Sequence, residues 1–353
     1  MQQADKVVLV TGGSGYIAGF LIQQLLAEGW YVRTTVRNPA REAALRPLLG
    51  GTAETLRFFT ADLTSDPGWS EAMAGCSHVA HVASPFSTNA PRHEDELIIP
   101  ARDGVLRALR FARDAGVGRF VQTSSVAAIA YGHGKNEHSG TGSHKYTEAD
   151  WTDLNGPGVY AYVKSKTIAE RAARDWIAAQ DEGKGGDGAM EFVSVNPSAV
   201  LGPVWNDDFS ASIEVVRQLL GGLLPGCPDL GFGIVDVRDV ADLHVRTLTA
   251  PGIAGGRFIA AGPFMKMIDV ARVLKAQLPE HARKVPTRRL PDWLVRVAAL
   301  FIPMLRQITG ELGNVRDVDA SHALNVLGWK TRPPEQSIVD CARSLIDRGV
   351  VKV

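Results

Sequence analysis

The chain has 353 residues, of which 45% are hydrophobic and 22% are charged, and this composition is typical of a globular protein with a sizeable core. Lys and Arg together number 38, as do Asp and Glu, so the formal net charge is zero and argues against a general nucleic-acid or membrane binder. The longest apolar run, residues 294–305, is too short to cross a bilayer and contains Arg296 and Pro303.

The sequence also carries few signs of a special compartment or of a metal. The opening residues 1–6 leave no room for a signal peptide, so a cytoplasmic protein is expected. Cys76, Cys227 and Cys341 are odd in number, far apart and without metal-ligand spacing. We therefore expect reduced structural thiols and no metal site.

The first stretch predicts a strand, a glycine turn and a helix. Residues 6–10 are a short apolar run of the kind found in a buried parallel strand, and apolar residues then recur at helical spacing as far as Gly29. Between them lies Gly12-x-x-Gly15-x-x-Ala18, preceded by Thr11. Any tight strand-to-helix turn favours glycine, but in this context the pattern indicates a dinucleotide site whose pyrophosphate meets the helix N-terminus.

The residue after the second predicted strand, residues 30–36, bears on the choice of cofactor. An acidic residue there binds the adenosine ribose and repels a 2′-phosphate. This chain has Arg37, with Arg33 and Arg41 nearby and no acid. A guanidinium pairs well with phosphate, so NADP(H) is expected to be preferred and NAD(H) stays possible; a solvated arginine at a strand end is the alternative.

The rhythm of strands and helices continues through the first half. Strands are predicted at residues 56–60, 78–82 and 119–123, with a long helix at 97–115. Five such strands alternating with helices predict a Rossmann-type, doubly wound parallel α/β sheet whose ligand lies at the carboxyl ends of the strands. Ser124 and Ser125 follow the fifth of these strands directly.

A second decisive stretch is the predicted helix at residues 159–180. Residues four apart share a helix face, so a Tyr-x-x-x-Lys pair can present a phenol and an ammonium to one ligand. The chain offers this spacing as Tyr160/Lys164 and as Tyr162/Lys166, about 200° apart around the helix. The spacing alone leaves the choice between the two pairs open.

Taken together, these motifs resemble the extended short-chain dehydrogenase/reductase family, part of the NAD-dependent epimerase/dehydratase superfamily. The run from Tyr162 to Glu170 matches the Tyr-x-x-Ser-Lys-x-x-Ala-Glu of dihydroflavonol-reductase-like and aldehyde-reductase-like members, and the other register does not. The resemblance implies that Tyr162, Lys166 and Ser125 are catalytic. Cinnamoyl-CoA reductases carry a different run at this place, which counts against a CoA-thioester substrate.

The same resemblance implies a set of cofactor contacts. Asp62 would border the adenine, although it could equally cap the turn that follows it. The run Asn196-Pro-Ser-Ala-Val-Leu-Gly-Pro203 would pass the nicotinamide. The expected cofactor-binding residues are Thr11, Gly12, Ser14, Gly15, Tyr16, Ile17, Arg37, Asp62, Leu63, Val82, Ala83, Ser84, Tyr162, Lys166, Pro197, Ser198 and Val200.

Past residue 203 the α/β rhythm breaks. We expect a dinucleotide-binding domain at residues 1–203, to which 234–261 return, and a smaller, mostly helical substrate lobe at 204–233 and 262–353. The expected function is NADPH-dependent reduction of an aldehyde or ketone, in a monomer or homodimer. A sugar-nucleotide epimerase or dehydratase, a hydroxysteroid dehydrogenase, and a non-catalytic NADP(H) sensor are the alternatives.

Overall fold

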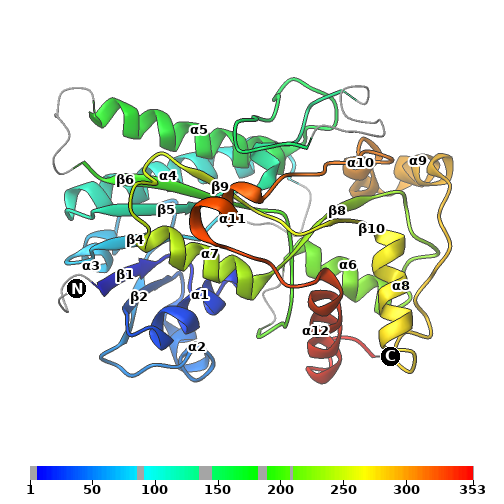
Figure 1. The fold of residues 1–353 in the computed structure, drawn as a ribbon, viewed down its shortest axis with the longest axis horizontal. Helices are drawn as coiled ribbons and strands as arrows, with labels where there is room; N and C mark the ends of the chain where they lie inside the picture. Colours follow the sequence, from blue (N-terminus) through cyan, green and yellow to red (C-terminus); the bar gives the residue numbers. More distant parts are fainter. Residues whose placement is uncertain (1–5, 86–90, 135–144, 182–188, 207–209, 353) are drawn as a thin grey trace.

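A seven-stranded sheet with helices on both faces forms the centre of the protein (Figure 1). The computed structural model describes residues 6–85, 91–134, 145–181, 189–206 and 210–352, so residues 1–5, on which the expectation about a signal peptide depends, lie outside it. The strand order is β3-β2-β1-β4-β5-β6-β9, and every neighbouring pair is parallel. The strands are β1 (Val7–Val10), β2 (Tyr31–Val36), β3 (Leu56–Thr60), β4 (His78–His81), β5 (Arg119–Thr123), β6 (Glu191–Pro197) and β9 (Arg257–Ala260).

Two pairs of helices sandwich this sheet. Helices α4 (Asp95–Asp114) and α5 (Ala161–Asp181) pack together on the upper face in Figure 1, and α1 (Tyr16–Ala27) and α7 (Val237–Thr249) on the lower. Because both faces are covered, β1 is a purely apolar strand with Val8, Leu9 and Val10 fully buried. The predicted doubly wound α/β sheet is confirmed.

The helices α2 (Glu42–Leu49) and α3 (Trp69–Met73) complete this part of the chain. Helix α2 has no counterpart among the predicted elements. It contains Pro47 and is followed by Gly50 and Gly51, residues that usually mark loops. Buried Leu45 and Leu49 nevertheless hold it to the core, so tertiary packing overrides the local signal.

A second, three-stranded sheet lies beyond the carboxyl end of the large one. Strands β7 (Ala199–Leu201) and β8 (Gly231–Asp236) are parallel, and β10 (Phe264–Lys266) is antiparallel to β8. The sequence pattern did not predict these short strands. Residues 234–236, expected in the large domain, belong to β8, whereas α7 and β9 do join the large sheet.

The C-terminal part is mostly helical, as expected. Helix α12 packs against α6, α8 and β8, while α9 and α10 pack against each other and α11 against β9. Among the described residues no helix is both long and apolar enough to span a membrane. The bounds are α6 (Ala211–Leu220), α8 (Met267–Gln277), α9 (Asp292–Phe301), α10 (Pro303–Thr309), α11 (Ser321–Leu327) and α12 (Pro334–Asp347).

A buried carboxylate ties α5 to the sheet. Glu170 is fully buried, and its Oε1 accepts hydrogen bonds from Arg257 Nε at 2.8 Å and Arg174 Nε at 3.2 Å. Burial on its own would raise the pKa of this carboxyl, but the charges of Arg257 and Arg174 hold the pKa below its ordinary value. Glu170 is therefore an ionised buried group whose charge two guanidiniums offset.

The same carboxylate also reaches the ends of two strands. Ser124 Oγ, just past β5, and Asn196 Nδ2, in β6, donate to Glu170 Oε2 at 2.5 and 2.8 Å. Ser194 Oγ donates to Oε1 at 3.0 Å. Since Asn196 Nδ2 also donates to the carbonyl of Ser125 at 3.2 Å, this network fixes the chain at the point where β5 ends.

We expect Glu170→Gln to lower the free energy of unfolding by about 3–5 kcal/mol, because it leaves Arg174 and Arg257 without their buried counter-charge. Urea denaturation followed by circular dichroism measures the change. The matched control is Glu42→Gln, which removes a surface pair with Arg46 and should cost at most about 0.5 kcal/mol. An equal, small effect of both substitutions would contradict a stabilising role for the network.

Candidate active site

The glycine turn lies where the strand order of the large sheet reverses. Strands β1 and β4 are neighbours here, and the connections that leave them run in opposite directions, which opens a crevice at their carboxyl ends. Gly12 has φ +74°, and a Cβ there would lie 3.1 Å from Ala83 Cα. Glycine is thus required both by the backbone conformation and by the close approach of the two loops.

Internal hydrogen bonds shape the turn, and helix α1 begins directly after it. Gly12 N donates to Thr35 Oγ1 at 2.9 Å and Gly15 N to the carbonyl of Gly12 at 2.8 Å, which closes the turn. Helix α1 then begins at Tyr16, and the amides of its first turn, including Ile17, have no partner within the helix. Amides and helix dipole together favour an anion, so the turn fits a pyrophosphate.

Thr11 joins the two loops on either side of the crevice. Its Oγ1 accepts the amide hydrogen of Ala83 at 2.9 Å and lies 3.2 Å from His81 Nδ1. Val82, Ala83 and Ser84 are all partly exposed directly after β4. The expected cofactor residues of both loops therefore border one crevice.

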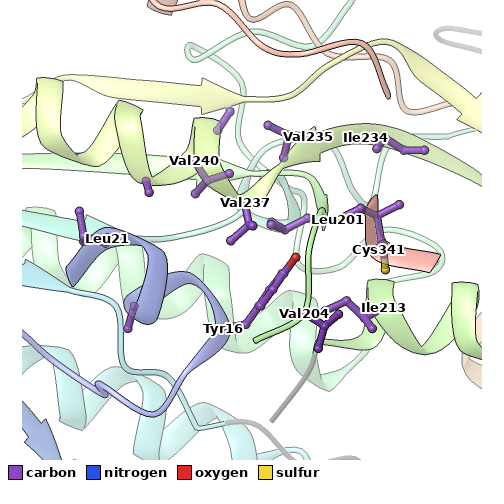
Figure 2. Close-up of a cluster of buried hydrophobic side chains, with 14 of the residues drawn as sticks. Tyr16, Leu21, Leu201, Val204, Ile213, Ile234, Val235, Val237, Val240 and Cys341 are labelled. Carbon is purple, nitrogen blue, oxygen red and sulfur yellow. The ribbon is translucent and has the colours of Figure 1, made fainter. Parts of the chain in front are cut away.

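The side chain of Tyr16 does not take part in this crevice. It is only 6% exposed and lies among Leu201, Val204 and Val237, as Figure 2 shows. Its phenol has no hydrogen-bond partner among the described residues. Tyr16 was expected to bind the cofactor, and in this structure only its backbone could do so.

A segment after β7 holds the turn from behind. Trp205 Nε1 donates to the carbonyl of Tyr16 at 3.2 Å, and Asn206 Nδ2 donates to that of Ser14 at 2.7 Å. A Cβ on Gly19 would lie 2.2 Å from the Trp205 ring. No local pattern points to these two supporting residues, apart from the glycine in α1 that makes room for Trp205.

The adenosine end of the crevice is more open. Arg37 is exposed after β2, whereas Arg33 is held elsewhere by the carbonyls of Glu71 and Ala72. Asp62 Oδ1 accepts from the amide and the hydroxyl of Thr64, at 2.8 and 2.6 Å.

The bonds to Thr64 lower the pKa of the Asp62 carboxyl. Asp62 thus caps its own turn, the second of the two expected roles, and its contact with adenine stays a prediction. Leu63 is partly buried against Gly104 of α4, and its carbonyl accepts from Arg107.

The three expected catalytic residues come together at the end of β5. The Ser125 hydroxyl lies close enough to the Tyr162 phenol to lower the pKa of the phenol. Lys166 Nζ lies 5.9 Å from the centre of the Tyr162 ring, one helical turn along α5. Ser124 points the other way, to Glu170, as expected from the alternation of side chains in an extended chain.

The competing pair is not available for the same role. Lys164 Nζ forms a 2.6 Å ion pair with Glu94 at the start of α4. Tyr160 contacts Tyr131 edge to face, with ring centres 6.4 Å apart. Its phenol has a strongly raised pKa because it is buried. The structure therefore separates the residues of this pair and brings Tyr162, Lys166 and Ser125 together.

Burial decides the proton affinities of the catalytic groups. It raises the pKa of the Tyr162 phenol, an effect that the nearby Ser125 hydroxyl partly offsets. It lowers the pKa of Lys166 to about 8, against the charge of Glu170. At neutral pH the phenol keeps its proton and the ammonium keeps its charge, so Tyr162 can act as an acid beside a cation.

The three residues expected beside the nicotinamide, Pro197, Ser198 and Val200, lie in different surroundings. Pro197 ends β6, and its carbonyl accepts from Ser125 Oγ at 3.4 Å. Ser198 is partly exposed, and its amide donates to Ala260. Val200 is buried in the core within β7, so its side chain is not placed to touch a ligand.

Two supporting residues, Glu170 and Asn196, were absent from the expected site. Both stand inside the motifs that the sequence singled out, at the end of the Tyr-x-x-Ser-Lys-x-x-Ala-Glu run and at the start of the Asn-Pro run. Among the described residues, no cluster of three His, Cys, Asp or Glu side chains is arranged to hold a metal ion.

Comparison with known proteins places the chain in a family. The model of the NAD dependent epimerase/dehydratase family matches residues 8–260. A cinnamoyl-CoA reductase of Medicago truncatula is 33% identical over 284 residues, which cover 78% of this chain and 83% of that protein. A dihydroflavonol 4-reductase of Hordeum vulgare is 30% identical over 283 residues, which cover 78% of this chain and 75% of that protein.

Solved structures agree with this placement. The yeast methylglyoxal/isovaleraldehyde reductase Gre2, complexed with NADPH, is similar with a TM-score of 0.78 and 25% identity, covering 98% of this chain and 100% of that one. The sequence-based prediction of the family is confirmed: the chain belongs to the NAD dependent epimerase/dehydratase family, in which these relatives are reductases.

Proposed function

We propose that this protein is an NADPH-dependent carbonyl reductase that converts an aldehyde or ketone to an alcohol, reversibly. The observation that carries the proposal is that Ser125, Tyr162 and Lys166 lie together at the same sheet edge as the glycine turn. At the level of the family, the predicted reductase activity is confirmed by the relatives.

The chemistry of these residues follows from where charge develops. When bound, a reduced nicotinamide would supply the hydride, and the carbonyl oxygen of the substrate would gain negative charge. Ser125 Oγ and Tyr162 Oη hold this oxygen and stabilise the charge as it forms. Tyr162 Oη gives its proton to the oxygen, and the Lys166 ammonium stabilises the phenolate that remains.

The proposed choice of NADPH depends on Arg37. Its exposed guanidinium follows β2, where an acid would bind an unphosphorylated ribose. Arg33 is committed to backbone carbonyls, so Arg37 is the better candidate for the 2′-phosphate. The absence of an acid here also disfavours an NAD-dependent epimerase, and the assembled Tyr162/Lys166 pair disfavours a non-catalytic sensor.

The substrate and its setting are further parts of the proposal. Residues 204–233 and 262–353 would form the lobe that covers the substrate above the nicotinamide. Relatives include both cinnamoyl-CoA and dihydroflavonol reductases, so similarity does not separate a CoA thioester from a ketone. The run around Tyr162 favours a free aldehyde or ketone. We propose a cytoplasmic monomer or homodimer.

We expect Tyr162→Phe to lower kcat about 10²–10⁴-fold while NADPH still binds, because the variant loses the proton donor and little else. Turnover is followed by NADPH absorbance over a panel of aldehydes, ketones and β-keto esters, and binding by NADPH fluorescence. Tyr160→Phe is the matched control and should retain activity. The proposal fails if Tyr162→Phe turns over normally.

We expect Arg37→Glu to weaken NADPH binding at least tenfold and to leave NADH binding unchanged or improved, since a carboxylate repels the 2′-phosphate. Titration with each cofactor measures both affinities. Arg57→Glu makes the same charge change at an exposed position on β3 and serves as control. Equal losses for both cofactors in Arg37→Glu would contradict the assigned role.

A further inference from the structure

Behind Lys166, residues from two strands, two helices and the loop after β4 line a small cavity. Its lining includes His81 of β4, Gln122 of β5, Lys166 of α5 and Ser84. His81 and Gln122 are direct partners in the register of β4 and β5, so their side chains stand side by side on the face that α4 and α5 cover. The cavity has room for about a single water molecule.

Thr11 lies beside His81 Nδ1 and can select the tautomer of the ring. Thr11 Oγ1 already accepts the Ala83 amide hydrogen, so its own hydrogen is available for His81 Nδ1, 3.2 Å away. Burial lowers the pKa of His81 to about 3, and the charge of Lys166 adds to this effect, so the ring is neutral. A neutral ring that accepts at Nδ1 carries its hydrogen on Nε2.

Gln122 provides an acceptor that is not used. The residue is only 4% exposed, and its Oε1 is buried with no hydrogen-bond partner among the described residues. A buried amide oxygen without a partner costs about 1–3 kcal/mol, which makes such groups rare in native proteins. Gln122 also lines the cavity, so a water molecule there could supply the missing partner.

We propose that this cavity is a water-binding site, in which one ordered water accepts hydrogen bonds from Lys166 Nζ and His81 Nε2 and donates one to Gln122 Oε1. The inference rests on the proposed function only where it concerns catalysis. The three polar groups offer two donors and one acceptor, which match the two lone pairs and one of the two hydrogens of a water molecule.

The water would hold the Lys166 ammonium in place and solvate its charge. Lys166 also faces Glu170 and the Tyr162 ring on its own helix and His81 on β4; Glu170 raises its pKa and burial lowers it, to about 8. NADPH should therefore bind best below pH 8 and more weakly as the pH rises through this value, because the ammonium then loses its proton.

The test substitutes Gln122 in two opposite ways. Gln122→Met keeps the size but removes the water's acceptor. The alkaline limb, the pH range in which NADPH affinity and kcat/KM fall as Lys166 loses its proton, should therefore move down by about one pH unit. Gln122→Glu adds a carboxylate near the ammonium, so the limb should move up by a similar amount. Opposite shifts are not expected from mere loss of packing.

Thr123→Val is the matched control. Thr123 also borders the cavity, but its hydroxyl lies 2.7 Å from His244 Nε2 of α7, on the face of the sheet opposite Gln122. The variant disturbs β5 to a similar degree and should leave the alkaline limb where it is. Limbs that coincide in the wild type and both Gln122 variants would overturn the inference, even if Tyr162→Phe abolishes turnover as expected.

A crystal structure of the protein without cofactor gives a second readout that needs no activity. The expected result is one water within about 2.7–3.2 Å of Lys166 Nζ, His81 Nε2 and Gln122 Oε1, and no such water in Gln122→Met. A wild-type structure with Gln122 Oε1 bonded to protein instead would overturn the inference. If the water is present but no carbonyl compound is reduced, the proposed function fails and the site stands.

Discussion

The buried charge of Glu170 is the constraint on which the site depends. Glu170 belongs to α5, and its carboxylate joins this helix to β6 through Ser194, to β9 through Arg257 and to the end of β5 through Ser124. An ionised group is held at full burial only when it is paired and hydrogen-bonded, so these elements are fixed relative to one another. The helix that carries Tyr162 and Lys166 is thereby fixed over the strand end that carries Ser125.

Charge and burial then divide the roles within the site. Burial disfavours the charged form of both side chains: it raises the pKa of the Tyr162 phenol and lowers that of Lys166. At neutral pH the phenol is nevertheless protonated and the ammonium charged. That combination suits a proton donor whose product is an anion beside a cation. Tyr160 and Lys164 have the same spacing in the sequence, yet the ion pair between Lys164 and Glu94 keeps them from this arrangement.

Predictions from the sequence were most accurate where a local pattern of residues determines the structure. Alternating strands and helices predicted the large sheet, and the Tyr-x-x-Ser-Lys-x-x-Ala-Glu run selected the register in which Tyr162 meets Ser125. Contacts between distant segments carried no local signal, which is why Trp205 behind the glycine turn was missed. The side chain of Tyr16 turns into the core (Figure 2), and that of Val200 is also buried, because packing rather than motif position decides where an apolar side chain points.

The arrangement of the phenol and the ammonium at the nicotinamide is the central claim. A crystal structure with NADP⁺ tests it most directly. The expected result places Lys166 Nζ within hydrogen-bond distance of the nicotinamide ribose hydroxyls, with Tyr162 Oη and Ser125 Oγ together facing the reactive side of the ring. A ring that lies instead beside Tyr160 and Lys164, or a dinucleotide bound away from Gly12, would contradict the account.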